Sequence, residues 1–148
     1  MRIYIGSDHA GFEMKRELIS SLAGITREII DCGPFQYVHD DDYPDFVSIV
    51  AEHVSKESGV WGIVVGRNGQ GEAIVANRFP NVRCVVFYGG TKHVLTLSRE
   101  HNDANMLSLG SNFLTSVEAK QSVLLWLNTK FSGDERHVRR IKKIEKYS

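Results

Sequence analysis

The sequence predicts an α/β fold: a three-layer sandwich with a five-stranded parallel sheet and a C-terminal helical extension. Five short runs rich in β-branched residues alternate with segments of helical length, which is the pattern of repeated strand–helix–strand units. The runs are almost continuously apolar, as expected for parallel strands that helices cover on both faces. The chain has 148 residues, so we expect residues 1–148 to form a single domain.

The elements follow from the chain in order. A helix is expected where Met14, Leu18 and Leu22 fall on one face. Pro44 suits the first turn of the next helix, and the three acids before it are interpreted as a solvated loop. The strands are expected at residues 2–6, 27–31, 61–66, 83–87 and 105–110, and the helices at residues 11–23, 43–58, 72–78, before His101, 116–128 and 134–146.

Charge and hydropathy narrow the class of partner. Lys plus Arg equals Asp plus Glu, at 18 each, so the chain lacks the basic excess of proteins that bind nucleic acid or an anionic membrane. No segment approaches the roughly 18 uninterrupted apolar residues of a membrane span, and the first residues do not resemble a secretion signal. We therefore expect a cytoplasmic protein with a small-molecule partner.

The two cysteines, Cys32 and Cys84, each lie in or at the end of a strand-like run. This placement suits buried, reduced thiols better than a disulfide framework or a metal cage. No metal site is expected.

The loop after the first strand, GSDHAGF at residues 6–12, carries a candidate site. Ser7 and Asp8 are candidates to cap the following helix, and Gly11 allows the chain to turn tightly. His9 points beyond a structural role. An imidazole beside a carboxylate holds one tautomer and donates toward a substrate oxygen or a phosphate.

The loop after the third strand, GRNGQGE at residues 66–72, differs from both common nucleotide-binding loops, in the residues that follow its glycines and in their spacing. Its glycines still allow successive N–H groups to converge into a nest that binds an oxyanion. Glu72 either interacts with the helix dipole or acts as a general base that removes a proton next to a carbonyl. The nest would consist of Arg67, Asn68, Gly69, Gln70 and Gly71.

A later motif, SREHNDAN, offers a histidine beside an amide. His101 lies four residues after Leu97, so it is either a core histidine or a group that moves a proton on a sugar ring oxygen. Asn102 beside it supports the second interpretation, because its side chain both donates and accepts hydrogen bonds.

The terminal segment ERHVRRIKKIEKY separates an apolar from a basic face on a helical wheel. Val138, Ile141 and Ile144 share the apolar face. The basic face is either simply solvated or a clamp for one phosphate, because Arg136 and Arg140 are four residues apart and guanidinium groups match phosphate oxygens.

Taken in order, the motifs GSDHAGF, DYPDF, GQGEAIVANR, SREHNDANML and ERHVRRI resemble those of the ribose-5-phosphate isomerase B family, which also contains the galactose-6-phosphate isomerase subunits. The resemblance covers nearly the whole chain. It implies a Rossmann-like sandwich and a homodimer or tetramer whose active sites are shared between subunits. It also implies interconversion of aldose and ketose phosphates without a metal or other cofactor.

By position, the resemblance implies that Asp8, His9 and Tyr43 contact the substrate and that residues 67–71 stabilise an enediolate, with Asn68 among the catalytic residues. Many members have a cysteine base where this chain has Gly66. Another branch has glycine there and a glutamate base at the position of Glu72.

The resemblance also assigns roles to the later candidates. His101 matches the residue that opens the furanose ring, with Asn102 beside it. Arg136 and Arg140 match phosphate ligands from the neighbouring subunit. Asn112 stands where members usually have an arginine, which implies a weakened or reshaped phosphate site.

These expectations combine into an isomerase of D-ribose 5-phosphate and D-ribulose 5-phosphate in the pentose phosphate pathway. It would work through a cis-enediolate, with Glu72 as base and His101 assisting ring opening. Isomerisation of allose 6-phosphate or galactose 6-phosphate by the same residues stays open, and so does a non-catalytic sugar-phosphate-binding subunit.

Overall fold

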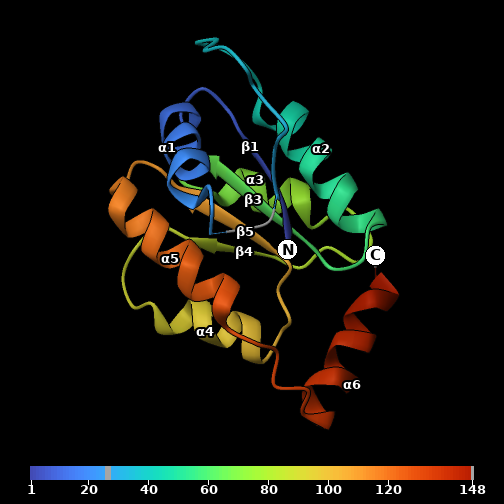
Figure 1. Ribbon diagram of the computed structural model, residues 1–148. Helices are drawn as coiled ribbons and strands as arrows, with labels where there is room; N and C mark the ends of the chain where they lie inside the picture. Colours follow the sequence, from blue (N-terminus) through green and yellow to red (C-terminus); the bar gives the residue numbers. More distant parts are fainter. Residues whose placement is uncertain (26–27, 148) are drawn as a thin grey trace.

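The computed structural model describes residues 1–25 and 28–147, and its sheet has five strands that all run parallel (Figure 1). The predicted sheet is confirmed, with strand ends that differ from the prediction by one residue. Arg27, the predicted start of the second strand, lies outside the described residues. The spatial order β2-β1-β3-β5-β4 is built from β1 (Arg2–Ser7), β2 (Glu28–Asp31), β3 (Val60–Gly66), β4 (Cys84–Phe87) and β5 (Met106–Gly110).

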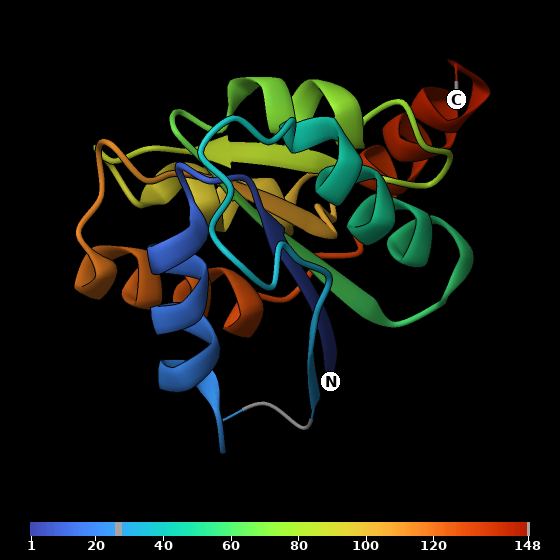
Figure 2. The same cartoon turned by 90° about the horizontal axis from the view of Figure 1, so that it is seen from above.

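Helices cover both faces of the sheet, so the three-layer prediction is confirmed. Figure 2 shows α2 (Tyr43–Lys56) and α3 (Gln70–Ala76) on one side, and α1 (Phe12–Leu22) and α5 (Ser116–Asn128) on the other. The helix α4 (His93–Glu100) packs beside α5, where Leu95 joins the same apolar cluster as Trp126. In the described part of the chain, no helix is long and apolar enough to cross a membrane.

Each face of the sheet has its own apolar core because alternate side chains of a strand point to opposite faces. Ile63 and Val65 of β3 pack with α1 and α5, whereas Val64 packs with α2 and α3. Cys32 and Cys84 are buried and free, as predicted. Burial raises the pKa of the Cys32 thiol to about 11 and that of Cys84 further, so both thiols are unreactive near neutral pH.

The strand order places a topological switch point between β1 and β3. The chain leaves β1 for β2 on one side and returns to β3 on the other, and such switch points are where open α/β sheets bind ligands. Gly11 lets the loop after β1 pack against β3, since a Cβ there would lie 2.1 Å from the carbonyl oxygen of Val65. Its φ of −94° is ordinary, so Gly11 is needed for space and not for the tight turn that the sequence suggested.

A buried cation fixes the loop that follows β2. Lys15 of α1 has no exposed side-chain surface, and its Nζ donates to Asp31 Oδ1 at 2.6 Å and to the carbonyl oxygen of Pro34 at 2.8 Å. The backbone N–H of Ser7 donates to the carbonyl of Gly33 at 3.1 Å. The start of this loop is therefore attached to both α1 and the end of β1.

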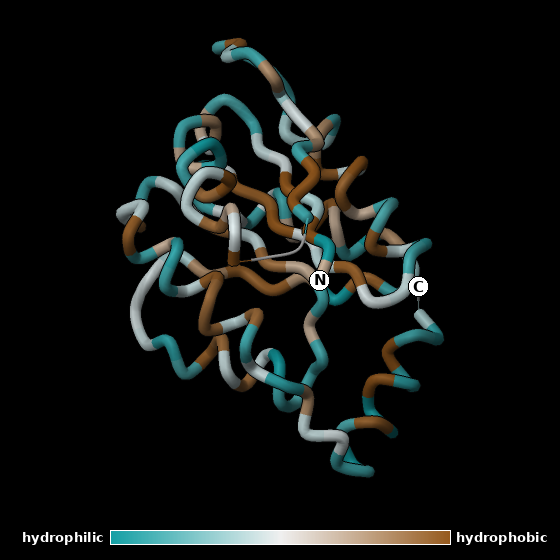
Figure 3. The backbone as a smooth tube through the Cα atoms, in the orientation of Figure 1, coloured by the Kyte–Doolittle hydropathy of each residue, from teal (hydrophilic) through white to brown (hydrophobic). Residues whose placement is uncertain are grey.

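The final helix α6 (Glu135–Ile144), followed by the 3₁₀ turn η1 (Glu145–Tyr147), stands apart from the sheet at the lower right of Figure 1. Apolar and polar segments alternate along it in Figure 3, in agreement with the two predicted faces. Only His137 and Ile141 are buried in α6, and Ile144 is 48% exposed. The chain itself therefore covers only part of the apolar face.

Candidate active site

Three loops meet where the parallel strands end, and we call this place the carboxyl edge of the sheet. They are the loops after Ser7, Gly66 and Gly110. The N–H of Ser111 donates to the carbonyl of Gly66 at 2.8 Å, and its Oγ donates to the carbonyl of Ala10 at 2.9 Å. The N–H of Asn112 donates to the carbonyl of Arg67 at 3.1 Å. The structure thus places Asn112 and Arg67 side by side at the carboxyl edge.

The carboxylate of Glu72 lies over Gly66. A Cβ built on Gly66 would lie 1.6 Å from Glu72 Oε1 and 2.2 Å from its Cδ, so the carboxylate fills the space that a side chain at residue 66 would need. Glu72 belongs to the first turn of α3 and is 4% exposed. The sequence placed this acid at the loop edge, and the structure adds that glycine at residue 66 makes its position possible.

Burial shifts the pKa of the Glu72 carboxyl. Removal from water raises the pKa of its carboxyl, the nearby charge of Asp8 raises it further, and a hydrogen bond from its own backbone N–H works against both. A base with a raised pKa holds an abstracted proton more readily than an ordinary glutamate does.

Asp8 lies beside this carboxylate and is 6% exposed. Its Oδ1 accepts a hydrogen bond from the N–H of Gly11 at 3.0 Å. Neither Ser7 nor Asp8 caps α1, because the helix begins after Gly11 without a side-chain cap. The predicted cap is therefore wrong, and Asp8 instead fixes the turn in front of the helix.

The glycine-rich loop presents backbone N–H groups beside Glu72. Gly69 has φ +79° and its carbonyl accepts from Ser108 Oγ at 2.7 Å. Asn68 Oδ1 accepts a hydrogen bond from the N–H of Gln70 at 2.9 Å. The Gln70 N–H of the predicted nest therefore already has an acceptor within the loop. Within residues 1–25 and 28–147, no protein acceptor is found for the N–H groups of Arg67, Asn68, Gly69 and Gly71.

Two further predicted residues lie at the same edge. A Cβ on Gly71 would lie 2.7 Å from the Oη of Tyr43, so the tyrosine ring rests on the loop. His9 lies beside Asp8 and is hydrogen-bonded to Asp41 at 2.8 Å. The interpretation of residues 40–42 as a solvated loop is wrong for Asp41, whose side chain is 8% exposed.

The other predicted residues lie near the starts of the strands, at the segments before Val60, Cys84 and Met106. We call this place the amino edge of the sheet. His101 follows α4 and precedes β5, and its ring stacks on that of His137 at 4.3 Å between centroids and 16° between planes. His137 is 3% exposed and belongs to α6, the helix that carries Arg136 and Arg140.

The structure therefore divides the predicted site in two. The carboxyl-edge half-site contains Asp8, His9, Tyr43, Arg67, Asn68, Gly69, Gln70, Gly71, Glu72 and Asn112. The amino-edge half-site contains His101, Asn102, Arg136 and Arg140. Opposite ends of parallel strands separate the two halves, so one chain does not bring them into contact.

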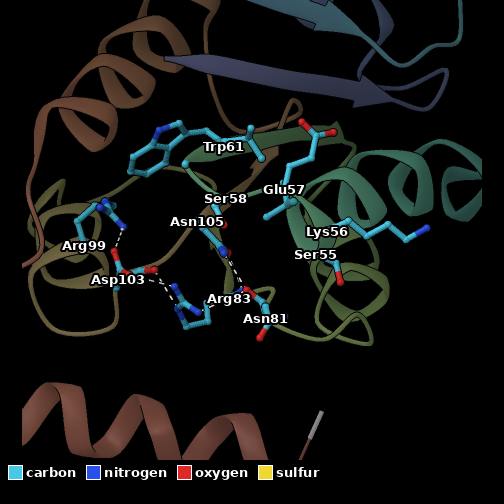
Figure 4. Close-up of a pocket in the computed structure, with 13 residues that line it drawn as sticks. Ser55, Lys56, Glu57, Ser58, Trp61, Asn81, Arg83, Arg99, Asp103 and Asn105 are labelled. Carbon is cyan, nitrogen blue, oxygen red and sulfur yellow. Dashed lines mark hydrogen bonds and ion pairs between the residues drawn. The ribbon is translucent and has the colours of Figure 1, made fainter.

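A pocket of about 340 Å³ opens near the amino edge, between the end of α2 and the turn before β5 (Figure 4). Its arginines are already engaged. Arg99 Nη1 donates to Asp103 Oδ1 at 2.8 Å, and Arg83 Nη2 donates to Asp103 Oδ2 at 3.1 Å. Arg83 Nε also donates to the carbonyl of Asn102 at 3.2 Å, so these cations hold the turn that carries Asn102.

Sequence reasoning missed Asp41 and His137. Asp41 lies in a run of acids and contacts a residue 32 positions earlier, so no local pattern distinguishes it from its neighbours. His137 lies between Ile144 and Ile141 on the wheel, on the apolar face, but its partner His101 lies just after α4, far away in the sequence. In the described ranges, no group of three or more His, Cys, Asp or Glu side chains could hold a metal ion.

A family model, the sequences of known proteins and solved structures all relate this chain to one family. Residues 3–144 match the family described as Ribose/Galactose Isomerase. The chain is 40% identical over 147 residues to ribose-5-phosphate isomerase B of Mycobacterium tuberculosis. The aligned region covers 99% of this chain and 90% of that protein. It is 36% identical over 143 residues to the Escherichia coli protein of the same name, with 97% and 93% covered.

Solved structures agree with these matches. Ribose-5-phosphate isomerase B of Clostridium thermocellum superposes with a TM-score of 0.91 and 41% identity over the full length of both chains. The Mycoplasma genitalium enzyme with bound ribulose-5-phosphate superposes with a TM-score of 0.92 and 35% identity, covering 99% of this chain and 95% of that one.

Proposed function

The chain belongs to the ribose/galactose isomerase family, and on that premise we propose that it interconverts D-ribose 5-phosphate and D-ribulose 5-phosphate in the pentose phosphate pathway. The proposed enzyme is an aldose–ketose isomerase that works through a cis-enediolate. The observation that carries this mechanism is the buried carboxylate of Glu72, which lies over Gly66 in a loop with four backbone N–H groups that have no acceptor among the described residues.

The chemistry follows from these groups. Glu72 removes the proton from C2 of the open-chain aldose, the electron pair forms the C1–C2 double bond, and the negative charge moves to O1. A proton passes from O2 to O1, Glu72 returns its proton to C1, and the O2 carbonyl of the ketose forms. The N–H groups of Arg67, Asn68, Gly69 and Gly71 stabilise the enediolate oxygen, which is the role of an oxyanion hole.

A second copy of the chain completes the site in this proposal. Opening of the furanose ring needs a group that moves a proton on the ring oxygen, and His101 with Asn102 is the candidate. In one chain these residues are at the amino edge of the sheet, whereas Glu72 is at the carboxyl edge. The substrate therefore lies between one subunit's carboxyl-edge half-site and its partner's amino-edge half-site, in a homodimer or a tetramer.

In this proposal the phosphate is also bound by residues of the partner subunit. Arg136 and Arg140 are exposed on α6 and would reach the site from the partner subunit, where guanidinium groups match phosphate oxygens. Asn112 supplies no positive charge, and Arg67 is the cation next to it. We expect Arg140→Ala to raise KM for the sugar phosphate with a smaller effect on kcat.

The test is conversion of ribose 5-phosphate by the purified chain in the presence of a chelator, repeated with Glu72→Gln. We expect activity to survive chelation in the parent and to fall about 10²-fold to 10⁴-fold in the variant, the usual contribution of a positioned general base. Glu17→Gln, which changes an exposed glutamate of α1, is the matched control and should keep full activity. Near-normal turnover by a folded Glu72→Gln variant would exclude Glu72 as the base.

The same assay distinguishes the alternatives. Turnover of allose 6-phosphate or galactose 6-phosphate, but not of ribose 5-phosphate, would keep the mechanism and change the substrate. Binding of ribose 5-phosphate without turnover would instead indicate a sugar-phosphate-binding subunit.

A further inference from the structure

We propose that Asp41 is a positioning residue for His9: it holds the imidazole in one orientation and one tautomer, so that Nε2 is left for the substrate. This inference rests on the proposed function, in which His9 contacts the sugar phosphate. It concerns a residue of the acidic run before α2 that has no direct part in the proposed chemistry.

A single oxygen of Asp41 accepts two hydrogen bonds from His9. The backbone N–H of His9 donates to Asp41 Oδ1 at 2.8 Å, and the ring Nδ1 lies 2.8 Å from the same oxygen. A carboxylate only accepts, so Nδ1 carries the proton in this contact. The backbone and the ring of His9 are thus fixed together, and Nε2 is the remaining ring nitrogen.

The position of Asp41 is not that of a solvated surface acid. Its side chain is 8% exposed, and its Oδ2 is buried without a hydrogen-bond partner among the described residues. A buried carboxylate oxygen without a partner is unfavourable, so the contact with His9 is kept against a desolvation cost. Its neighbours Asp40 and Asp42 are exposed.

The loop that carries Asp41 is fixed at both ends. Lys15 holds its start through Asp31 and the carbonyl of Pro34. Its end leads directly into α2, which begins at Tyr43. The fold itself therefore presents Asp41 to His9.

The charges around His9 favour the imidazolium form. Asp41 and Asp8 face it from two loops, and the ring of His39 lies 6.1 Å away between centroids. The hydrogen bond to Asp41 raises the pKa of His9, and the charge of Asp8 also raises it, whereas burial lowers it. A protonated His9 donates from Nε2 to an anionic substrate oxygen, which a neutral ring with its proton on Nδ1 does not do.

The experiment compares Asp41→Asn with Asp40→Asn, a matched change at an exposed acid of the same loop. NMR titration of the histidine ring should show the pKa of His9 fall in Asp41→Asn, because the charged hydrogen-bond acceptor is lost, and stay unchanged in Asp40→Asn. KM for ribose 5-phosphate should rise about tenfold in Asp41→Asn, while kcat changes less than about threefold. An unchanged pKa of His9 in Asp41→Asn would overturn the proposal.

A double-mutant cycle separates positioning from a general loss of structure. In a His9→Gln background, Asp41→Asn should have little further effect on KM, because there is no imidazole left to orient. Fully additive effects would contradict the proposal.

The parent protein offers a test that needs no variant and no substrate. The ¹⁵N shifts of His9, measured above its pKa, should report a proton on Nδ1, and a proton mainly on Nε2 would overturn the assignment. Because this measurement does not involve turnover, it remains decisive if ribose 5-phosphate proves not to be the substrate.

Discussion

At the scale of single residues, the space between Gly66 and Glu72 controls the proposed base. We expect Gly66→Ala to lower kcat about 10²-fold, because the new methyl group would occupy the position of the Glu72 carboxylate and displace it by an ångström or more. Steady-state kinetics with ribose 5-phosphate would measure this change.

The control for this prediction is Gly66→Ala in a variant that lacks the Glu72 carboxylate. In a Glu72→Gln background, Gly66→Ala should lower kcat much less, since the group that it displaces no longer acts. An equal loss in both backgrounds would show that the methyl group disturbs the loop by another route.

Glu72 also has a predicted cost in stability. Because burial raises the pKa of this carboxyl in the folded state, the folded protein binds the proton more tightly than the unfolded chain, and stability falls as pH rises through the interval between the two pKa values. We expect Glu72→Gln to raise the midpoint of thermal unfolding by about 2–4 °C at pH 7. Calorimetry should show this gain shrink as pH falls toward the ordinary glutamate pKa of 4.5, and a variant that is less stable at pH 7 would contradict the assignment.

Site residues could be predicted from the sequence where one short loop contains a characteristic combination of residue types. Glycines and an acid within residues 66–72 place the nest and Glu72 without any knowledge of distant segments. Asp41 and His137 were not predictable, because each is defined by a contact across the fold that sequence spacing does not encode.

At the scale of elements, α6 is attached to the rest of the chain through few contacts, and the stack of His137 on His101 is one of them. Burial, His101, Arg136 and Arg140 lower the pKa of His137, while Asp134 works in the other direction. Protonation therefore favours detachment of α6. Hydrogen exchange should show the protection of α6 amides decrease as pH falls below the ordinary imidazole pKa of 6.5.

The variant His137→Phe isolates this effect, since it keeps an aromatic ring against His101 and removes the titrating group. Its α6 protection, corrected for the intrinsic pH dependence of exchange, should stay constant over the same range. His93→Phe, at an exposed position of α4, should behave like the parent. A pH response that persists in His137→Phe would assign it to another group.

Element types and their order were predictable, because apolar runs of strand length and helical periodicity are local properties. Element ends were less so. The third helix begins at Gln70, two residues before its predicted start, because the glycine-rich loop already turns into the helix at Gly69. The wheel predicted both faces of α6, but Ile144 is exposed, and what covers it is not encoded in the helix itself.

At the scale of the whole molecule, the division of the site predicts complementation between inactive chains. Glu72→Gln removes the proposed base from the carboxyl-edge half-site, and His101→Asn removes the proposed ring-opening group from the amino-edge half-site. An equal mixture assembled together should recover up to about a quarter of parent activity, because half of randomly paired dimers are mixed and each has one intact site of two.

The control mixes two variants of the same half-site, Glu72→Gln and Gly66→Ala, which should recover nothing beyond their separate activities. Native mass spectrometry would establish that mixed dimers form in both cases. If mixed dimers of the first pair are present and inactive, the two half-sites do not face each other across subunits.

The shared volume over Gly66 also has an evolutionary consequence. A lineage that gained a side chain at residue 66 would displace the carboxylate of Glu72, and one that first lost Glu72 would lose the proposed base. Each single step therefore crosses a fitness valley, and the two positions are expected to change together or not at all. Ancestral reconstruction along such a lineage would find intermediates of low activity unless both changes arose on the same branch.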